Sequence, residues 1–264
     1  MRFSQISFSK WHALGNSYLL VDQAELGRPL DPEQVARLCD IRYGLGSDGV
    51  LEVVSAAGTR AEIVIWNPDG SVAEFSGNGT RIAAAWLAER AGAVEVTVTV
   101  SGREYAGTVH GAEIGLEVGP VEVHEPETIE LGDERIELTR VSVGNPHAVV
   151  RRDANREELL RLGPLLERHG RFPDRTNVQL IRVDGAHDVT ALVWERGAGE
   201  TSSSGSSAVA VAAAAIANGW CQSPVIVHLP GGDLGVTLDE ENRATLTGPA
   251  TLICTGETVE QVGR

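Results

Sequence analysis

The 264-residue chain carries the same arrangement of polar and small residues twice, and this internal repeat constrains the fold more than any other feature. In the first half, Asn67 stands nine residues before Ser76, which opens an alanine-rich apolar segment over residues 80–90. In the second half, Glu195 stands nine residues before Ser204, which opens a second such segment. Matched spacings of this kind are typical of a duplicated unit, so the sequence predicts two lobes.

Further upstream, each half also carries a Gly-Asn pair. Asn16 lies 60 residues before Ser76, and Asn145 lies 59 residues before Ser204. Small hydroxyl residues commonly cap helices, and the unpaired backbone N–H groups at a helix start can bind an anion such as a carboxylate. The two serines therefore mark either an anion site in each lobe or an ordinary capped core helix.

Composition narrows the class of function. The net charge of −15 argues against nucleic acid or an anionic membrane as a partner, because both require a basic patch. With no signal peptide or membrane-spanning run, a cytoplasmic enzyme is expected. The cysteines, Cys39, Cys221 and Cys254, are scattered and odd in number, which indicates neither a disulfide framework nor a metal site. Because Lys10 is the only lysine, a pyridoxal-phosphate Schiff base would have to rest on it alone.

Hydrophobic periodicity and capping signals predict short strands with a few helices. Asp31 and Gln34 can form a capping box, which predicts a helix from Pro32 to about Cys39. Residues 44–49 lack the lysine of a phosphate-binding loop and are predicted to form a tight turn. The other predicted elements are a strand, loop and strand over residues 8–22, strands over 61–66, 94–100 and 188–195, and a helix over 156–169.

Seven sequence blocks, taken together and in order, resemble the diaminopimelate epimerase family. The blocks are HALGNSYLLVD, LCDIRYGLGSDG, WNPDGS, SGNGTR, VGNPHAVV, FPDRTNVQL and WERGAGET. The family interconverts LL- and meso-diaminopimelate without a cofactor, in lysine and peptidoglycan precursor synthesis. The resemblance implies an α+β fold of two pseudo-symmetric lobes, each a mainly antiparallel β-sheet or barrel wrapped around a central helix. We expect an N-terminal lobe over residues 1–122, joined by the tail from about 252 to 264, and a C-terminal lobe over 123–251.

The chain departs from the family at its two catalytic positions. The family uses a pair of cysteines, one to remove the α-proton and one to return a proton on the opposite face, whereas this chain has Ser76 and Ser204. The pKa of a free cysteine is ~8.5, and that of a hydroxyl is about 7 units higher, so forming the anionic base costs up to ~10 kcal/mol more. His147 and Glu195 match family residues beside the pair and are candidates for activating the serines.

The positions that bind substrate in the family are retained in kind. Arg196 would pair in bidentate fashion with the distal carboxylate of a diaminopimelate-like ligand. Backbone donors for the reacting carboxylate would come from Gly77 and Asn78 at one helix start and from Gly205 and Ser206 at the other. The remaining family contacts map onto Asn16, Asn67, Asn145, Asn177 and Glu195.

The sequence thus favours a cofactor-independent amino-acid epimerase acting on a small diaminopimelate-like substrate, with a homodimer suggested by the resemblance. A racemase or dehydratase for another amino acid is one alternative. A homologue that binds the ligand with little or no turnover is another, because both cysteines are serine. Phe75 and Ser203 also depart from the usual pattern beside the serines, which favours natural divergence over two deliberate replacements.

Overall fold

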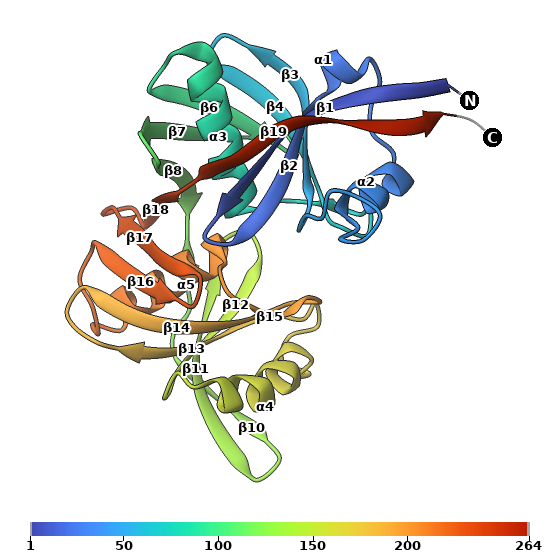
Figure 1. Ribbon diagram of the computed structural model, residues 1–264. Helices are drawn as coiled ribbons and strands as arrows, with labels where there is room; N and C mark the ends of the chain where they lie inside the picture. The colour runs from blue at the N-terminus through green and yellow to red at the C-terminus, as the bar shows by residue number, and fades with distance from the viewer. Residues whose placement is uncertain (1, 263–264) are drawn as a thin grey trace. The chain divides into compact units, whose positions relative to one another are not determined.

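The computed structural model describes residues 2–262, which divide into two compact units (Figure 1). The N-terminal unit runs to Leu116 and takes back the chain from Gly248 onward, and the C-terminal unit covers Glu117–Thr247. The strand β8 (Glu113–Pro120) carries the chain from the first unit into the second. The lobe bounds expected from the sequence, 1–122 with 252–264 and 123–251, remain predictions.

The N-terminal unit surrounds one buried helix with strands. That helix, α3 (Gly77–Ala91), packs against several strands of the unit, and alanines on most of its faces let them approach closely. The elements of the unit before β8 are β1 (Arg2–Ala13), β2 (Asn16–Asp22), α1 (Gln23–Leu26), α2 (Pro32–Cys39), β3 (Val50–Ala57), β4 (Arg60–Trp66), β5 (Val72–Ala73), α3, β6 (Glu95–Val100) and β7 (Arg103–His110). The final strand, β19 (Thr251–Val262), pairs antiparallel with β1, and Figure 1 shows the two side by side.

The C-terminal unit is built in the same way around α5 (Gly205–Ala217). Nearly every residue of α5 is buried, and strands on several sides contact it. The other elements are β9 (Glu122–Val123), β10 (Glu127–Leu131), β11 (Glu134–Ser142), β12 (Pro146–Arg151), α4 (Arg156–Glu167), β13 (Asn177–Val183), β14 (Asp188–Glu195), β15 (Gly199–Thr201), β16 (Val225–Leu229), β17 (Gly232–Leu238) and β18 (Arg243–Pro249).

Strand pairing repeats between the two units. In the N-terminal unit β2 and β3 pair in parallel, β3 and β4 antiparallel, and β4 and β6 in parallel. In the C-terminal unit β12 and β13, β13 and β14, and β14 and β16 pair in the same three ways. Antiparallel pairing joins β6 to β7 in the first unit and β16 to β17 in the second. The α+β fold predicted from the sequence, with a central helix in each of two similar lobes, is therefore confirmed.

Local predictions agree with the structure where capping signals were clear. The helix α2 has the predicted bounds, and its capping box joins Asp31 and Gln34 in both directions. The helix predicted over 156–169 ends two residues earlier, at Glu167. The predicted turn at 44–49 belongs to an irregular loop, and Lys10 Nζ donates to the carbonyls of Leu45 and Gly46 within it. The only lysine thus has a structural partner.

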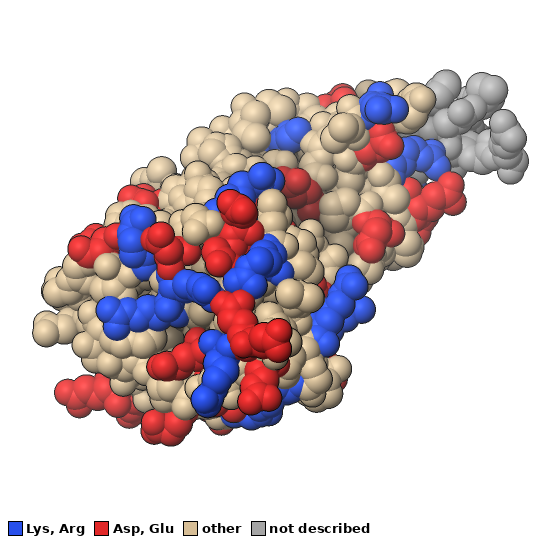
Figure 2. All heavy atoms as spheres, turned by 90° about the horizontal axis from the view of Figure 1, so that it is seen from below, with Lys and Arg blue, Asp and Glu red and all other residues tan. Residues whose placement is uncertain are grey.

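Charged side chains of the C-terminal unit pair with one another at the surface. Glu134 accepts hydrogen bonds from Arg161 and Arg152, which lower its pKa to about 2. Arg161 also pairs with Glu158 on α4, and Arg171 pairs with Glu127. Figure 2 shows basic and acidic side chains interspersed on this face, with no broad basic patch of the kind that nucleic acid requires. Within residues 2–262, no helix is both long and apolar enough to cross a bilayer.

Candidate active site

Ser76 occupies the N-cap of α3, as its position in the repeat predicted. Its backbone is extended, and its Oγ accepts a hydrogen bond from the Gly79 N–H at 3.1 Å. The next two residues, Gly77 and Asn78, are buried in the first turn, where an α-helix offers its N–H groups no intrahelical partner. This helix start can therefore receive a carboxylate at the backbone of the two residues assigned to that role.

A tyrosine also contacts Ser76. The hydroxyl of Tyr18, on β2, lies 3.1 Å from Ser76 Oγ, and the tyrosine side chain is only 7% exposed. The ring is closely fitted, because a Cβ on Gly49 would come within 2.7 Å of it. No role was predicted for Tyr18 from the sequence, although it stands two residues after Asn16.

Asn16 and Asn78 lie together and are fixed by a buried arginine. Asn78 Nδ2 donates to Asn16 Oδ1 at 3.2 Å, and Asn78 Oδ1 accepts from Arg81 at 2.7 Å. Arg81 also donates to the Gly77 carbonyl and is fully buried, which lowers its pKa to about 10 although Glu113 opposes the shift. The guanidinium therefore stays charged at neutral pH and orients the start of α3. No sequence motif had indicated a role for Arg81.

Asn67 lies in the turn between β4 and β5. Its backbone N–H donates to the Ser71 carbonyl and its Nδ2 donates to Ser71 Oγ at 2.9 Å. Asp48 similarly fixes the turn after Asn16 by accepting from both the backbone N–H and the hydroxyl of Ser17. The asparagines predicted to bind substrate in this unit are therefore held by side-chain hydrogen bonds.

Ser204 occupies the N-cap of α5, but its side chain is used differently from that of Ser76. It makes no capping hydrogen bond, and its hydroxyl instead acts on the carboxylate of Glu195, at the end of β14, by lowering the pKa of that group. Burial raises the pKa of Glu195, and the hydrogen bond from Ser204 opposes part of that shift. A carboxylate whose pKa is raised toward neutrality is a stronger base than an exposed one. The structure therefore joins two of the predicted catalytic residues, Ser204 and Glu195.

His147, on β12, is engaged with other partners. Gln179 donates from its amide to His147 Nδ1 at 3.0 Å, so the proton lies on Nε2, which donates to Asn145 Oδ1 at 2.9 Å. The ring is 1% exposed, and burial, with a smaller contribution from the charge of Arg196, lowers its pKa to about 3. His147 is therefore neutral at physiological pH and orients Asn145. Gln179 also donates to the buried Ser207, one residue beyond Ser206 in α5.

The state of His147 predicts a contribution to acid unfolding. The folded-state pKa near 3 lies below the unfolded value of 6.5, so the unfolded chain gains a proton and stability is lost as pH falls below 6.5. Between pH 7 and pH 5 this loss is about 2 kcal/mol. His147→Gln should therefore lose less stability over that interval in urea unfolding. His110→Gln, an exposed control, should follow the unmodified protein; equal pH dependence in all three proteins would contradict the assignment.

Asn177 connects the strand ends of this unit. Its Oδ1 accepts from the Arg196 backbone N–H at 3.0 Å, and its Nδ2 donates to the Pro146 carbonyl at 3.0 Å. The Arg196 guanidinium is exposed and donates to the Asp174 carbonyl. It is therefore free to exchange that contact for a ligand carboxylate without unfolding any element.

A buried carboxylate supports the same turn from beneath. Glu167 accepts from Trp194 Nε1 at 2.8 Å and from the Gly197 N–H at 3.0 Å. Burial tends to raise the pKa of Glu167, but these hydrogen bonds outweigh it and the pKa is lowered. Glu195 and Arg196 lie between the two donors, so Glu167 fixes their backbone. Its position 28 residues before Glu195 gave no sequence signal.

Removing Glu167 should therefore loosen the turn. Glu167→Ala leaves the Trp194 and Gly197 donors unpaired, and we expect the free energy of unfolding to fall by about 3 kcal/mol in urea titration. Glu200→Ala is the matched control, because Glu200 is exposed and pairs with the exposed Arg156. A loss no greater than that of the control would show that Glu167 does not hold the turn.

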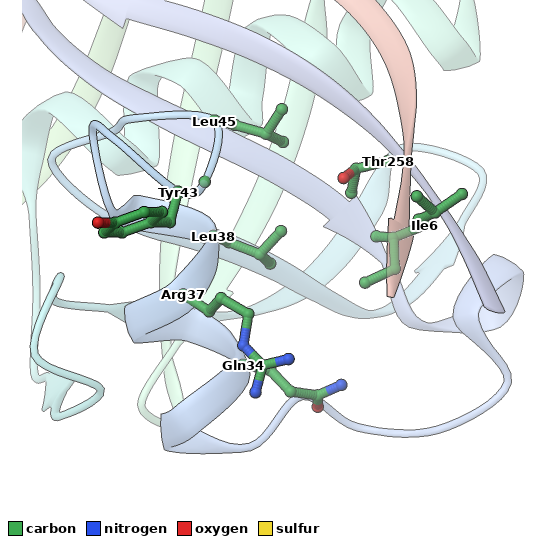
Figure 3. A pocket seen from close by; sticks show the side chains of 9 residues that line it. Ile6, Gln34, Arg37, Leu38, Tyr43, Leu45 and Thr258 are labelled. Atoms are coloured by element: carbon green, nitrogen blue, oxygen red, sulfur yellow. The ribbon is translucent and has the colours of Figure 1, made fainter. Parts of the chain in front are cut away.

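The other candidate features do not bear on this chemistry. Among the described residues no cluster of three or more histidine, cysteine or acidic side chains can hold a metal ion. Burial and the charge of Asp48 raise the pKa of Cys39 to about 11, and burial raises that of Cys221. A cavity of about 190 Å³ lies between α2 and β19. Leu38, Tyr43 and Thr258 are among the residues that line it (Figure 3). None of the predicted site residues lines it.

Comparison with known proteins agrees with the sequence blocks. The family model for diaminopimelate epimerase matches residues 8–123 and 139–253. Diaminopimelate epimerase 2 of Nostoc sp. is 35% identical, covering 96% of this chain and 95% of the relative. Diaminopimelate epimerase of Magnetococcus marinus is also 35% identical, covering 96% of each chain.

Solved structures share the fold at lower identity. A protein of Pseudomonas aeruginosa described as a predicted epimerase superposes with a TM-score of 0.72 at 18% identity, covering 96% of this chain and 99% of the other. A probable proline racemase of Agrobacterium radiobacter gives a TM-score of 0.70 at 17% identity, covering 98% and 93%. These likenesses concern the fold, whereas the family model and the 35% identical relatives extend over nearly the whole sequence. The chain belongs to the diaminopimelate epimerase family.

Proposed function

We propose that this protein epimerises a diaminopimelate-type amino acid at its α-carbon without a cofactor, with Ser76 and Ser204 as the two acid/base groups. The observation that carries the proposal is the placement of Ser204 at the N-cap of α5 with its side chain uncommitted to capping, where it acts on the carboxylate of Glu195, whose pKa is raised by burial. A serine hydroxyl alone is too weak an acid to supply a base, but a serine that can pass its proton to a neighbouring carboxylate is activated. Membership of the family supports the reaction class.

In the proposed reaction the α-proton moves to Ser204 Oγ while the proton of Ser204 moves to the Glu195 carboxylate. The electron pair of the broken C–H bond stays on the α-carbon and spreads into the substrate carboxylate. Backbone N–H groups at helix starts, of Gly77 and Asn78 and of Gly205 and Ser206, stabilise that carboxylate. Ser76 then gives a proton to the other face of the carbon, which inverts it.

The distal end of the substrate is assigned to the C-terminal unit. Arg196 has an exposed guanidinium suited to bidentate pairing with a second carboxylate. Its backbone is held by Asn177, and the amide side chains of Asn16, Asn67, Asn145 and Asn177 are assigned to the amino groups and carboxylates of the ligand. We propose conversion of LL- to meso-diaminopimelate, in lysine and peptidoglycan precursor synthesis, by a cytoplasmic homodimer.

Proton NMR in deuterium oxide tests this proposal. LL-diaminopimelate incubated with the protein should lose its α-proton signal as meso product appears. Loss of the α-proton signal from another amino acid only would point to a racemase or dehydratase and overturn the substrate assignment. Thermal stabilisation by diaminopimelate without exchange would identify a binding homologue and overturn the catalytic assignment. Arg196→Gln should raise KM for diaminopimelate more than it lowers kcat.

A further inference from the structure

The two serines have different acid/base partners. Ser204 acts on the pKa of a carboxylate, Glu195, whereas Ser76 Oγ lies 3.1 Å from the phenol of Tyr18. The backbone N–H of Gly79 also donates a hydrogen bond to Ser76 Oγ, but this amide cannot take a proton from the serine. The phenol is therefore the ionisable group in hydrogen-bond contact with Ser76.

We propose that Tyr18 is a positioning residue that relays protons through Ser76, which makes Ser76 the proton-donating serine when Ser204 and Glu195 remove the α-proton. This inference rests on the proposed function, because it assigns a partner to one of its two serines. Tyr18 acts through Ser76 and is not placed in contact with the substrate.

The proton balance of the relay is simple. As the carbanion takes the proton of Ser76 and forms the new C–H bond, the Tyr18 hydroxyl proton moves to Ser76 Oγ, and the negative charge ends on the phenolate oxygen. Glu195 has meanwhile become neutral, so the charge of the protein and substrate together is unchanged. Exchange with water returns Tyr18 and Glu195 to their starting states.

The chemistry of a phenol suits this role. The pKa of a tyrosine is ~10, several units below that of an aliphatic hydroxyl, so proton donation that ends on a phenolate is much less costly than donation that ends on an alkoxide. Geometry also favours transfer, because the ring sits in a closely fitted place beside Gly49 and is mostly buried. Its hydroxyl is thus held at hydrogen-bond distance.

A double-mutant cycle tests the relay. A thiol at position 76 titrates near ~8.5 and needs no phenol behind it. Tyr18→Phe should therefore lower kcat for epimerisation about 100-fold in the unmodified protein, with KM within threefold. In the Ser76→Cys background the same change should alter kcat by less than threefold. Tyr105→Phe is the matched control, since Tyr105 is a buried tyrosine of the same unit that stacks on Phe75.

Each other result overturns the relay in a distinguishable way. If Tyr18→Phe lowers kcat equally in the unmodified and Ser76→Cys proteins, Tyr18 has a purely structural role. If it lowers kcat no more than Tyr105→Phe does, Tyr18 has no role in proton transfer. In either case the proposed function would stand, because the unmodified protein would still exchange the α-proton. No exchange by the unmodified protein would overturn the function and the relay together.

Discussion

Replacing Ser76 and Ser204 together with cysteine should raise the rate of epimerisation by orders of magnitude. The difference in acidity between a thiol and a hydroxyl, about 7 pKa units, corresponds to as much as ~10 kcal/mol in forming the anionic base. Glu195 and Tyr18 recover part of that difference by accepting or supplying protons, so the gain should be smaller than the full figure. NMR measurement of LL- and meso-diaminopimelate over time, at saturating substrate, gives kcat for the unmodified protein and for the double-cysteine variant.

The control for this variant is a thiol placed nearby but off the helix start. Ser202→Cys is suitable, because Ser202 is exposed and lies two residues before Ser204. It should leave kcat unchanged. No gain from the double-cysteine protein, with its fold intact by circular dichroism, would mean that the serines do not occupy the acid/base positions.

The fold could be predicted because its signals are local or periodic. The capping box of Asp31 and Gln34 marks the start of α2. The spacing shared by Asn67–Ser76 and Glu195–Ser204 predicted the repeat that the strand pairings show. Helix ends were less well predicted. The helix α4 ends at Glu167, two residues before the end predicted at His169.

The candidate site was predicted only as far as its motifs extend. The repeat and the family blocks located Ser204 and Glu195, which lie nine residues apart. The hydrogen bonds that hold the site join residues far apart in the sequence. Tyr18 and Ser76 are 58 residues apart, and Glu167 and Trp194 are 27 residues apart. Such pairs leave no periodic trace in a single sequence. The state of His147 was equally hidden, because its low pKa arises from burial beside Gln179 and not from its neighbours in GNPH.

Glu195→Gln should lower kcat by about 10²- to 10⁴-fold, the usual contribution of a positioned general base. The amide can still accept the hydrogen bond of Ser204 but cannot take its proton, so KM should change little. Because burial raises the pKa of Glu195 above 4.5, activity of the unmodified protein should fall as pH drops toward that raised pKa, since the carboxylate then gains a proton.

The pH profile and the cysteine background together isolate the role of Glu195. The acidic limb should be absent from the residual activity of Glu195→Gln and present in Glu200→Gln, an exposed glutamate five residues away that pairs with Arg156. With Ser204→Cys, the loss caused by Glu195→Gln should shrink, because a thiol ionises without a carboxylate to receive its proton. An undiminished loss in that background would mean that Glu195 holds the substrate or the turn, and that Ser204 obtains its basicity elsewhere.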